Sequence, residues 1–342
     1  SCQECAVLRR SRSCATVAWC GMAVAMAAAV PAPAAAPAGR LRVAVEPAAI
    51  RILDGERLIL AYAIEPPAVP PDIDPVCGRS GILHPVCSPR GTVVTGVVPR
   101  DHPHQSGIFT AWTNAVIGDR RVDFWNLPKR QGRVRHAAVR GTFAADDAAG
   151  FEVDLVHCTE EPEAVDVLRE SWKVTARATD GSHHCFDLDT VQRAIPPAVL
   201  TLPKYHYGGL AVRGPDAWLL PTDADIAAMP GEPPSGAEMV NSSGQGRADG
   251  NLAHARWVAM ASRPPEAAAC IVAMVHPSSF RAPQPARLHP TKPYVCFAPA
   301  ADGGFAIDEA TPFAARYRFL VTDGPVDRDW IEEAWRGWVA DP

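Results

Sequence analysis

Short apolar runs separated by turn residues recur along most of the chain, and this pattern predicts β-strands. Strand-like runs at 41–53 and 58–62 flank Asp54-Gly55, and an Asp-Gly pair between two such runs is a hairpin signal. Other apolar runs predict further strands at 92–98, 108–112, 134–141, 151–158, 210–212, 256–261, 268–275, 294–297 and 314–321. So many short strands are typical of an antiparallel β-protein.

Two longer segments alternate apolar with polar side chains. Residues 167–178 and 184–193 do so on the two sides of the turn 179–182, which predicts paired strands with one buried face. Only 328–339 has helical spacing, and 221–250 has no period and predicts a long excursion. The helical apolar positions are Trp330, Ile331, Ala334, Trp335 and Trp338. The predicted fold is mostly β, a large antiparallel β-sandwich with a short C-terminal helix.

The first forty residues have the layout of a targeting segment. Three arginines precede an apolar, alanine-rich run at 14–30, and a stretch of small residues and prolines follows. This order predicts a signal peptide over 1–38 and a single β-sandwich domain over 39–342. An uncleaved membrane anchor is the alternative, but the apolar run is shorter than the ~20 residues that a span needs. We therefore expect an exported protein, periplasmic or extracellular, with no membrane span after signal removal.

Composition narrows the function classes. The 342 residues carry a net charge of −5, so no basic excess is present to neutralise a phosphate backbone, which argues against nucleic acid as a partner. Six cysteines follow the targeting segment: Cys77, Cys87, Cys158, Cys185, Cys270 and Cys296. In an oxidising compartment Cys77 and Cys87 are close enough in sequence to form a disulfide, and buried free thiols are the alternative.

The densest chemical signal is Asp101-His102-Pro103-His104. Pro103 restricts its own backbone and that of His102, so both imidazoles project from a stiff loop. Histidine can act as an acid, a base or a metal ligand near neutral pH, and Asp101 could orient a neighbouring ring. A loop in which the histidines only fill gaps is the alternative.

Three other segments carry candidate ligand-binding groups. In the first, Asp123, Trp125 and Asn126 have the residue types of a sugar-binding surface, with a buried aromatic beside a turn as the alternative. The second and third provide acid/base and cationic groups, with an aromatic edge strand and a solvated loop as their alternatives. These candidates are Lys204, His206 and Tyr207 with Arg213 as an anion clamp, and His276 with Arg281. No phosphate-binding glycine loop, Gly-x-Ser-x-Gly or His-Glu-x-x-His motif is present, which disfavours nucleotide-dependent and serine-hydrolase chemistry.

Several of these segments resemble the PmoA-like family of mostly uncharacterised, often exported bacterial proteins. The resemblance covers about 41–323 and is carried by 84–91, 101–108, 111–112, 122–126, 208–213 and 276–278. The family more often has His-His-Arg-Gly where this chain has His104-Gln105-Ser106-Gly107. The "methane oxygenase" label used for the family does not fit this chain, because a membrane subunit of that kind needs several spanning helices. Residues 314–324 are similar to the last strand of galactose-mutarotase-like supersandwiches, which implies that fold.

These observations lead to one main functional hypothesis and two alternatives. In the first, His104 and His206 act as acid and base on a sugar held by Trp125, Asp123, Lys204 and Arg213, as in an epimerase, lyase or hydrolase. The second is a non-catalytic glycan-binding module with Trp112 and Trp125 as stacking platforms. The third is a metalloenzyme whose zinc or copper is held by His102, His104, His206 and His276. The expected partner is a carbohydrate or another small molecule, and no cofactor is expected apart from that metal.

Overall fold

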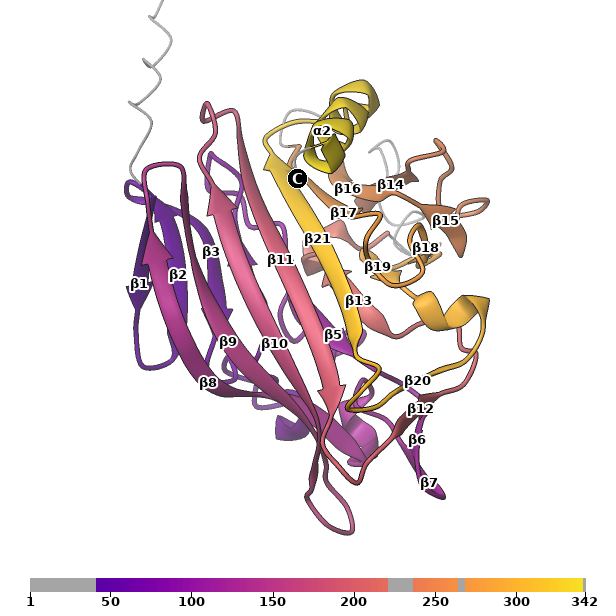
Figure 1. Cartoon of the computed structure of the whole chain (residues 1–342). Coiled ribbons are helices and arrows are strands. Elements are labelled where there is room, and N and C mark those ends of the chain that lie inside the picture. Colours follow the sequence, from indigo (N-terminus) through magenta and orange to yellow (C-terminus); the bar gives the residue numbers. More distant parts are fainter. Residues whose placement is uncertain (1–40, 221–235, 264–267, 341–342) are drawn as a thin grey trace, which may run out of the picture. The chain divides into compact units, whose positions relative to one another are not determined.

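The computed structural model describes residues 41–220, 236–263 and 268–340, so the predicted signal peptide lies outside the described residues. Two large antiparallel sheets and one small sheet account for the strands (Figure 1). The larger sheet has nine strands, in the order β1 (Leu41–Val45), β2 (Ala49–Asp54), β3 (Arg57–Ala63), β4 (Leu83–Val86), β5 (Ile108–Ala111), β13 (Gly209–Arg213), β19 (Tyr294–Phe297), β18 (Gln284–Leu288) and β15 (Ala253–Ala255).

The other two sheets have eight and four strands. The eight-stranded sheet has the order β14 (Gly236–Asn241), β16 (Trp257–Arg263), β17 (Cys270–Val275), β21 (Phe313–Thr322), β11 (His183–Ala194), β10 (Asp166–Arg177), β9 (Ala148–Thr159) and β8 (Gly132–Ala144). The small sheet has the order β20 (Phe305–Ile307), β12 (Leu200–Leu202), β6 (Ala115–Ile117) and β7 (Arg120–Val122). One α-helix, α2 (Arg328–Ala340), and short 3-10 turns at Pro75–Cys77, Leu127–Lys129, Asp216–Trp218 and Pro299–Asp302 complete the described elements.

The alternating pattern in the sequence explains the long strands. In β10 the residues Leu168, Trp172 and Val174 are buried, whereas Arg169 and Lys173 between them are exposed. These strands lie side by side in Figure 1, and β10 pairs with β11 across the predicted turn. The hairpin at Asp54-Gly55 forms as expected between β2 and β3. The predicted mostly-β antiparallel fold with a C-terminal helix is therefore confirmed.

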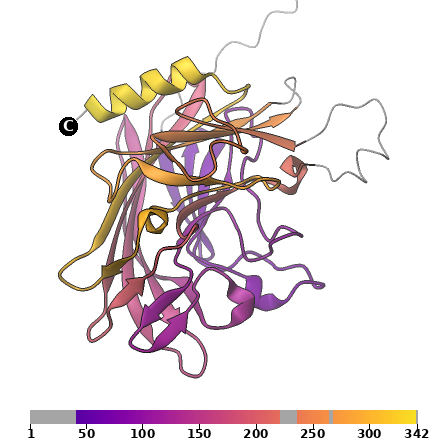
Figure 2. The ribbon, with the colours of Figure 1, turned by 90° about the vertical axis from the view of Figure 1, so that its right-hand side faces the viewer.

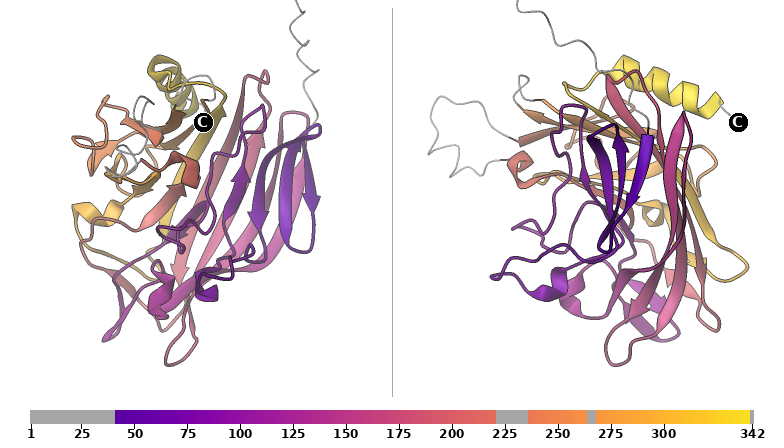
Figure 3. Two further views of the ribbon diagram at one scale, coloured as in Figure 1. Left: turned by 180° about the vertical axis from the view of Figure 1, so that it is seen from behind. Right: turned by 90° about the vertical axis from the view of Figure 1, so that its left-hand side faces the viewer.

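The main core lies between the two large sheets, and β1–β3 form the nearest layer when the protein is seen from behind (Figure 3). Phe297 of β19 stacks on Tyr317 of β21 with 5.8 Å between ring centroids, so the two sheets face each other there. A fully buried carboxylate, Glu170 of β10, also bridges the sheets because it accepts a hydrogen bond from Thr110 of β5. Its other donors are the side chains of His157, Trp172 and Thr190.

The helix α2 covers a second apolar cluster on the other side of the eight-stranded sheet (Figure 2). Its stripe of tryptophans and Ile331 packs against side chains of β16, β17 and β21. Trp338 is 4% exposed and contacts the Arg318 guanidinium at 5.0 Å from its ring centroid. The helical spacing seen in the sequence therefore marks the face that is buried. Among the described residues, no helix combines the length and the apolar character that a membrane crossing requires.

Two predictions about local structure are wrong. Residues 92–98 form no strand beyond a single bridge from Val93 to Cys87, because Val98 has a positive φ of 43° and the chain turns away there. The 221–250 segment is not wholly irregular, because Gly236–Asn241 pairs with β16 as β14. Residues 221–235 lie outside the described residues. All six cysteines after the targeting segment are buried free thiols, so Cys77 and Cys87 form no disulfide.

Candidate functional site

The candidate site is a pocket on the face of the nine-stranded sheet that points away from the main core. Side chains alternate along a strand, so when Phe297 faces the core, Tyr294 and Cys296 of β19 face the other way. Arg287 of β18 pairs with Cys296 and Arg213 of β13 pairs with Tyr294, which places both arginines on this outer face.

Loops from distant parts of the chain cover this face and leave a pocket of about 110 Å³. The pocket is open to solvent on one side, and its lining is mostly polar. Its lining residues are His102, His104, Gln105, Trp125, Asn126, Tyr207, Arg287, His289 and Tyr294. Three of the lining residues are histidines, and their rings lie close together. The ring centroids of His102 and His104 are 5.7 Å apart, and those of His102 and His289 are 6.2 Å apart.

Arg213 holds the histidine loop from below. This fully buried guanidinium donates to both carboxylate oxygens of Asp101 at 3.1 and 2.5 Å, and to the side-chain oxygen of Gln105 at 3.4 Å. At the end of the loop, Gly107 has a φ of +64°, and a side chain there would collide with the carbonyl oxygen of Leu83. The anion that Arg213 binds is therefore the protein's own Asp101. The sequence had predicted that both residues bind a ligand, but neither of them lines the pocket.

The hydrogen bonds at two histidines define which ring nitrogen carries the proton. Nδ1 of His102 lies 3.0 Å from the Asp101 carboxylate, which can only accept, so Nδ1 donates, and in the neutral ring Nε2 has the lone pair. Nδ1 of His289 accepts from the backbone N–H groups of Thr291 and Lys292, at 3.3 and 3.1 Å, so its proton is on Nε2. The pocket therefore has a proton acceptor at His102 and a proton donor at His289.

Electrostatics keep two of the three imidazoles neutral. Burial and the charge of Arg79 lower the pKa of His104 to about 4, and burial and Arg287 lower the pKa of His289 to about 4. Burial alone would raise the pKa of Asp101, but hydrogen bonds from His102 and Arg213 outweigh it and hold this pKa well below its usual value. At neutral pH, His289 is therefore an uncharged hydrogen-bond donor, and Asp101 is ionised.

Asp123 supports the pocket from behind and does not face a ligand. It is 2% exposed and accepts hydrogen bonds from the backbone of Trp125 and Asn126, the Asn126 amide and Lys129. The Asn126 amide also donates to the hydroxyl of Tyr207 at 3.1 Å. Asp123 therefore fixes Asn126 against Tyr207, and these two residues line the pocket whereas the carboxylate does not.

Other predicted site residues lie outside the pocket lining. Lys204 and His206 belong to a loop before β13 rather than to a strand, and both side chains are exposed. His276 bonds to Ser278 and packs on a tryptophan of α2. Arg281 donates to the carbonyl oxygens of Pro299, Gly303 and Gly304. From the candidate set, the pocket lining contains His102, His104, Trp125, Asn126 and Tyr207. It does not contain Lys204, His206, His276 or Arg281.

Four lining residues were not among the candidates. One of them, Gln105, lies within the histidine segment, whereas Arg287, His289 and Tyr294 lie far from it in the sequence. These three lie on or beside β18 and β19, whose pairing next to β13 no local pattern indicates. One signal was available, because His289-Pro290 repeats the dipeptide of His102-Pro103. The signal is weak, because the same dipeptide occurs at His84-Pro85 and His276-Pro277, and neither of those histidines lines the pocket.

The positions of the tryptophans and histidines bear on the two functional alternatives. Trp112 and Trp125 are each 1% exposed, so neither offers an open ring face to a glycan. In the described parts of the chain, no group of three or more histidine, cysteine, aspartate or glutamate side chains is arranged to hold a metal ion. At His289, Nδ1 accepts from the backbone N–H groups of Thr291 and Lys292 and Nε2 carries the proton, so the neutral ring has no free lone pair for a metal.

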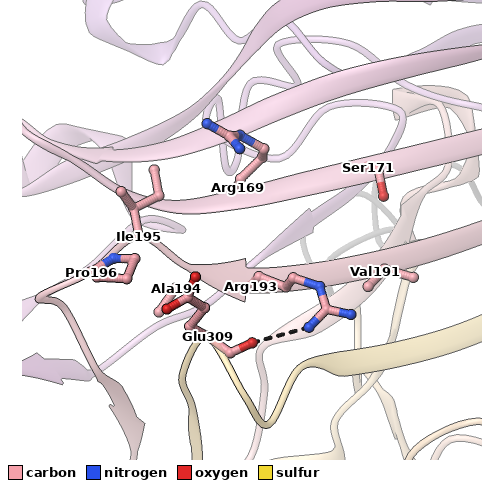
Figure 4. Close-up of a pocket in the computed structure, with 8 residues that line it drawn as sticks. All are labelled: Arg169, Ser171, Val191, Arg193, Ala194, Ile195, Pro196 and Glu309. Atoms are coloured by element: carbon pink, nitrogen blue, oxygen red, sulfur yellow. Dashed lines mark hydrogen bonds between the residues drawn. The ribbon is translucent and has the colours of Figure 1, made fainter.

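A larger pocket of about 190 Å³ lies on the eight-stranded sheet, and Figure 4 shows it in close-up. Arg169 and Arg193, which are cross-strand partners, line it, and Arg193 donates to the backbone oxygen of Glu309 at 3.0 Å. Both arginines are exposed, and the lining contains no histidine, cysteine or tyrosine. It therefore lacks the acid/base groups that the histidine pocket contains.

Fold and site together define a β-sandwich protein with a histidine-lined pocket on the outer face of one sheet. The chain belongs to the family of unknown function DUF6807, which matches residues 49–336. This agrees with the expected uncharacterised family, whereas none of the comparisons returned the PmoA-like name. No curated protein is significantly similar in sequence.

The solved structures that are similar to this chain include two α-galactosidases. One is a GH36 α-galactosidase from Geobacillus stearothermophilus in complex with raffinose, with 10% identity and a TM-score of 0.35. The other is an α-galactosidase from Lactobacillus brevis, with 9% identity and a TM-score of 0.29. Each match covers 83% of this chain but only 41% and 39% of the enzymes, so the chain spans about two fifths of their length.

Proposed function

We propose that the histidine pocket binds a sugar and that His102 acts there as a general base. The observation that carries this proposal is the chain of hydrogen bonds from Arg213 through Asp101 to His102, which leaves the Nε2 lone pair of His102 free. A base oriented by a buried carboxylate is the usual arrangement for histidine in proton transfer. His102 takes the role that the sequence assigned to His206.

The other lining groups suit a ligand rich in hydroxyl groups. Asn126, Gln105 and Tyr207 supply amide and hydroxyl groups that can both donate and accept hydrogen bonds. The protonated Nε2 of neutral His289 can donate to an oxygen that gains negative charge when His102 removes a proton. A pocket of about 110 Å³, open on one side, suits one sugar ring with any further substituent outside. The reaction class is therefore proton transfer on a sugar, as in an epimerase or lyase, or water activation in a hydrolase.

The experiment compares His102→Gln with His206→Gln, the same substitution at an exposed histidine outside the pocket. Wild type and both variants are incubated in D₂O with a panel of sugars, keto-sugars and glycosides, and product formation and deuterium uptake are followed by NMR. We expect His102→Gln to lower the rate by roughly 10²–10⁴-fold, the usual contribution of a general base, and His206→Gln to keep it. Equal rates for wild type and His102→Gln, or no reaction and no exchange with any compound, would refute the proposal.

A further inference from the structure

One cation in the pocket lining has no counter-charge. Arg287 of β18 is half-buried, and among the described residues its guanidinium makes no ion pair or hydrogen bond. Its one contact of note is with the ring of Tyr207, 6.0 Å from the centroid, which is a weak cation–π distance. An arginine that lines a pocket with its donors unused is available to bind a ligand.

A second cation behind the pocket, Arg79, makes no ion pair among the described residues. Arg79 is 3% exposed, lies 4.3 Å from the Phe109 ring centroid and donates only to the carbonyl oxygens of Phe124 and Trp125. Two of its guanidinium nitrogens, Nε and Nη1, have no hydrogen-bond partner in the part of the chain that the structure describes. Burial lowers the pKa of Arg79 to about 9, so it remains charged at neutral pH. In a buried site of low polarity, a charge without a partner acts over a longer range than at the surface.

The cations around the pocket outnumber the carboxylates, because Asp101 and Asp123 each have cationic partners besides these two arginines. Asp101 pairs with Arg213 and lies 3.7 Å from Lys292, and Asp123 pairs with Lys129. The positive charge of these arginines acts on the pocket itself. After burial, the charge of Arg79 is the next largest cause that lowers the pKa of His104, and the charge of Arg287 is the next largest for His289. The pocket thus has a positive potential that favours a negatively charged ligand.

We infer that the ligand is an anionic sugar, and specifically a uronic acid whose carboxylate pairs with Arg287. This inference rests on the proposed function of the same pocket and names its substrate class. The planar guanidinium of Arg287 matches a carboxylate with two parallel hydrogen bonds, and the Nε2 proton of His289 supplies a third donor. A phosphate group is usually bound by more hydrogen-bond donors, such as the backbone N–H groups of a glycine-rich loop. The sequence has no such motif.

Binding of matched sugars tests the inference without any need for turnover. D-galacturonate and D-glucuronate are compared with D-galactose and D-glucose by calorimetry, at low salt and with added NaCl, and glucose 6-phosphate is included as a different anion. We expect the uronates to bind about tenfold tighter or better than the neutral sugars, which is the fold-change for one charge-assisted contact. Added salt should reduce this preference.

Variants identify the residue responsible. Arg287→Gln should reduce the preference to within about twofold, whereas Arg287→Lys should keep part of it because the charge remains. Arg193→Gln, at an exposed arginine of the other pocket, should leave it unchanged. Equal binding of neutral sugars and uronates, tighter binding of the phosphate, a preference that survives Arg287→Gln, or no binding of any probe overturns the inference. His102→Gln separates the two proposals, since it should lower the rate of turnover by roughly 10²–10⁴-fold and keep uronate binding.

Discussion

Replacing Arg213 by methionine should destabilise the protein and loosen the histidine loop at the same time. The substitution keeps most of the side-chain length and removes only the guanidinium. That group is fully buried and donates to Asp101, Gln105 and Asp216, and to the carbonyl oxygen of Gly214. Without it, the Asp101 carboxylate, which is 13% exposed, keeps only His102 and the more distant Lys292.

The size of the effect follows from this burial. Removing one partner of a buried ion pair costs about 3–5 kcal/mol, because the other charge is left uncompensated. Asp101 is not completely buried and keeps two weaker partners, so we expect about 3 kcal/mol, at the low end of that range. For a domain of this size, the corresponding fall in melting temperature is about 5 °C.

Urea and thermal unfolding at pH 7 measure this loss against a matched control. Arg135→Met makes the same substitution in the pair of Arg135 with Asp166, whose side chains are 46% and 42% exposed. An exposed pair contributes less than about 1 kcal/mol, so this control should change stability little. Equal losses in the two variants, or a loss below about 1 kcal/mol for Arg213→Met, would refute the argument from burial.

The pH dependence provides a second check with a fixed sign. The folded pKa of Asp101 is depressed, so the pair stabilises the protein fully above the unfolded pKa of about 3.9. This contribution is lost as the pH falls through the folded value. The difference in stability between wild type and Arg213→Met should therefore be constant from about pH 5 to 7 and shrink below about pH 4.

Three further predictions concern the two cores. Glu170→Gln puts an amide N–H group against the hydrogen-bond donors that surround this side chain, so it should lower the free energy of unfolding in urea by about 2–4 kcal/mol. Its control, Glu152→Gln on the exposed side of β9, should change that free energy by less than about 0.5 kcal/mol. Burial raises the pKa values of Cys185 and Cys270 to about 12, so neither should react with a maleimide at pH 7 until the protein is unfolded, as mass spectrometry can count. Trp338→Ala should lower the unfolding free energy by about 3 kcal/mol, and an unchanged melting temperature would show that α2 adds no stability.

Local patterns in the sequence predicted the elements that depend on neighbours along the chain. The alternation in 167–178 and 184–193 gave the β10–β11 pair, and the tryptophan spacing gave α2, because each pattern records which side of one element is buried. The strand predicted at 92–98 was wrong because β-branched residues also occur in extended loops. Thr95 there accepts a hydrogen bond from the backbone of Val86 instead of extending a strand.

The site was only partly predictable for a physical reason. His102 and His104 are separated by only one residue, so the sequence showed two histidines close together. Trp125 and Asn126 had the residue types of a ligand-binding turn. Arg287 became part of the pocket only because β18 lies two strands from β13 in the sheet order. Such long-range strand order depends on the whole fold, and no local period records it.

The Gln105-Ser106 pair, where the resembled family more often has a histidine and an arginine, now has a structural explanation. Ser106 accepts a hydrogen bond from the backbone of Val98, and Gln105 accepts one from Arg213, so both side chains hold the loop. The proton acceptor of the pocket is His102, whose partner is Asp101, and neither residue depends on the identity of positions 105 and 106 for that hydrogen bond. The departure therefore changes how the loop is anchored and leaves the proposed base in place, which is why the pocket can be tested as a catalytic site in this chain.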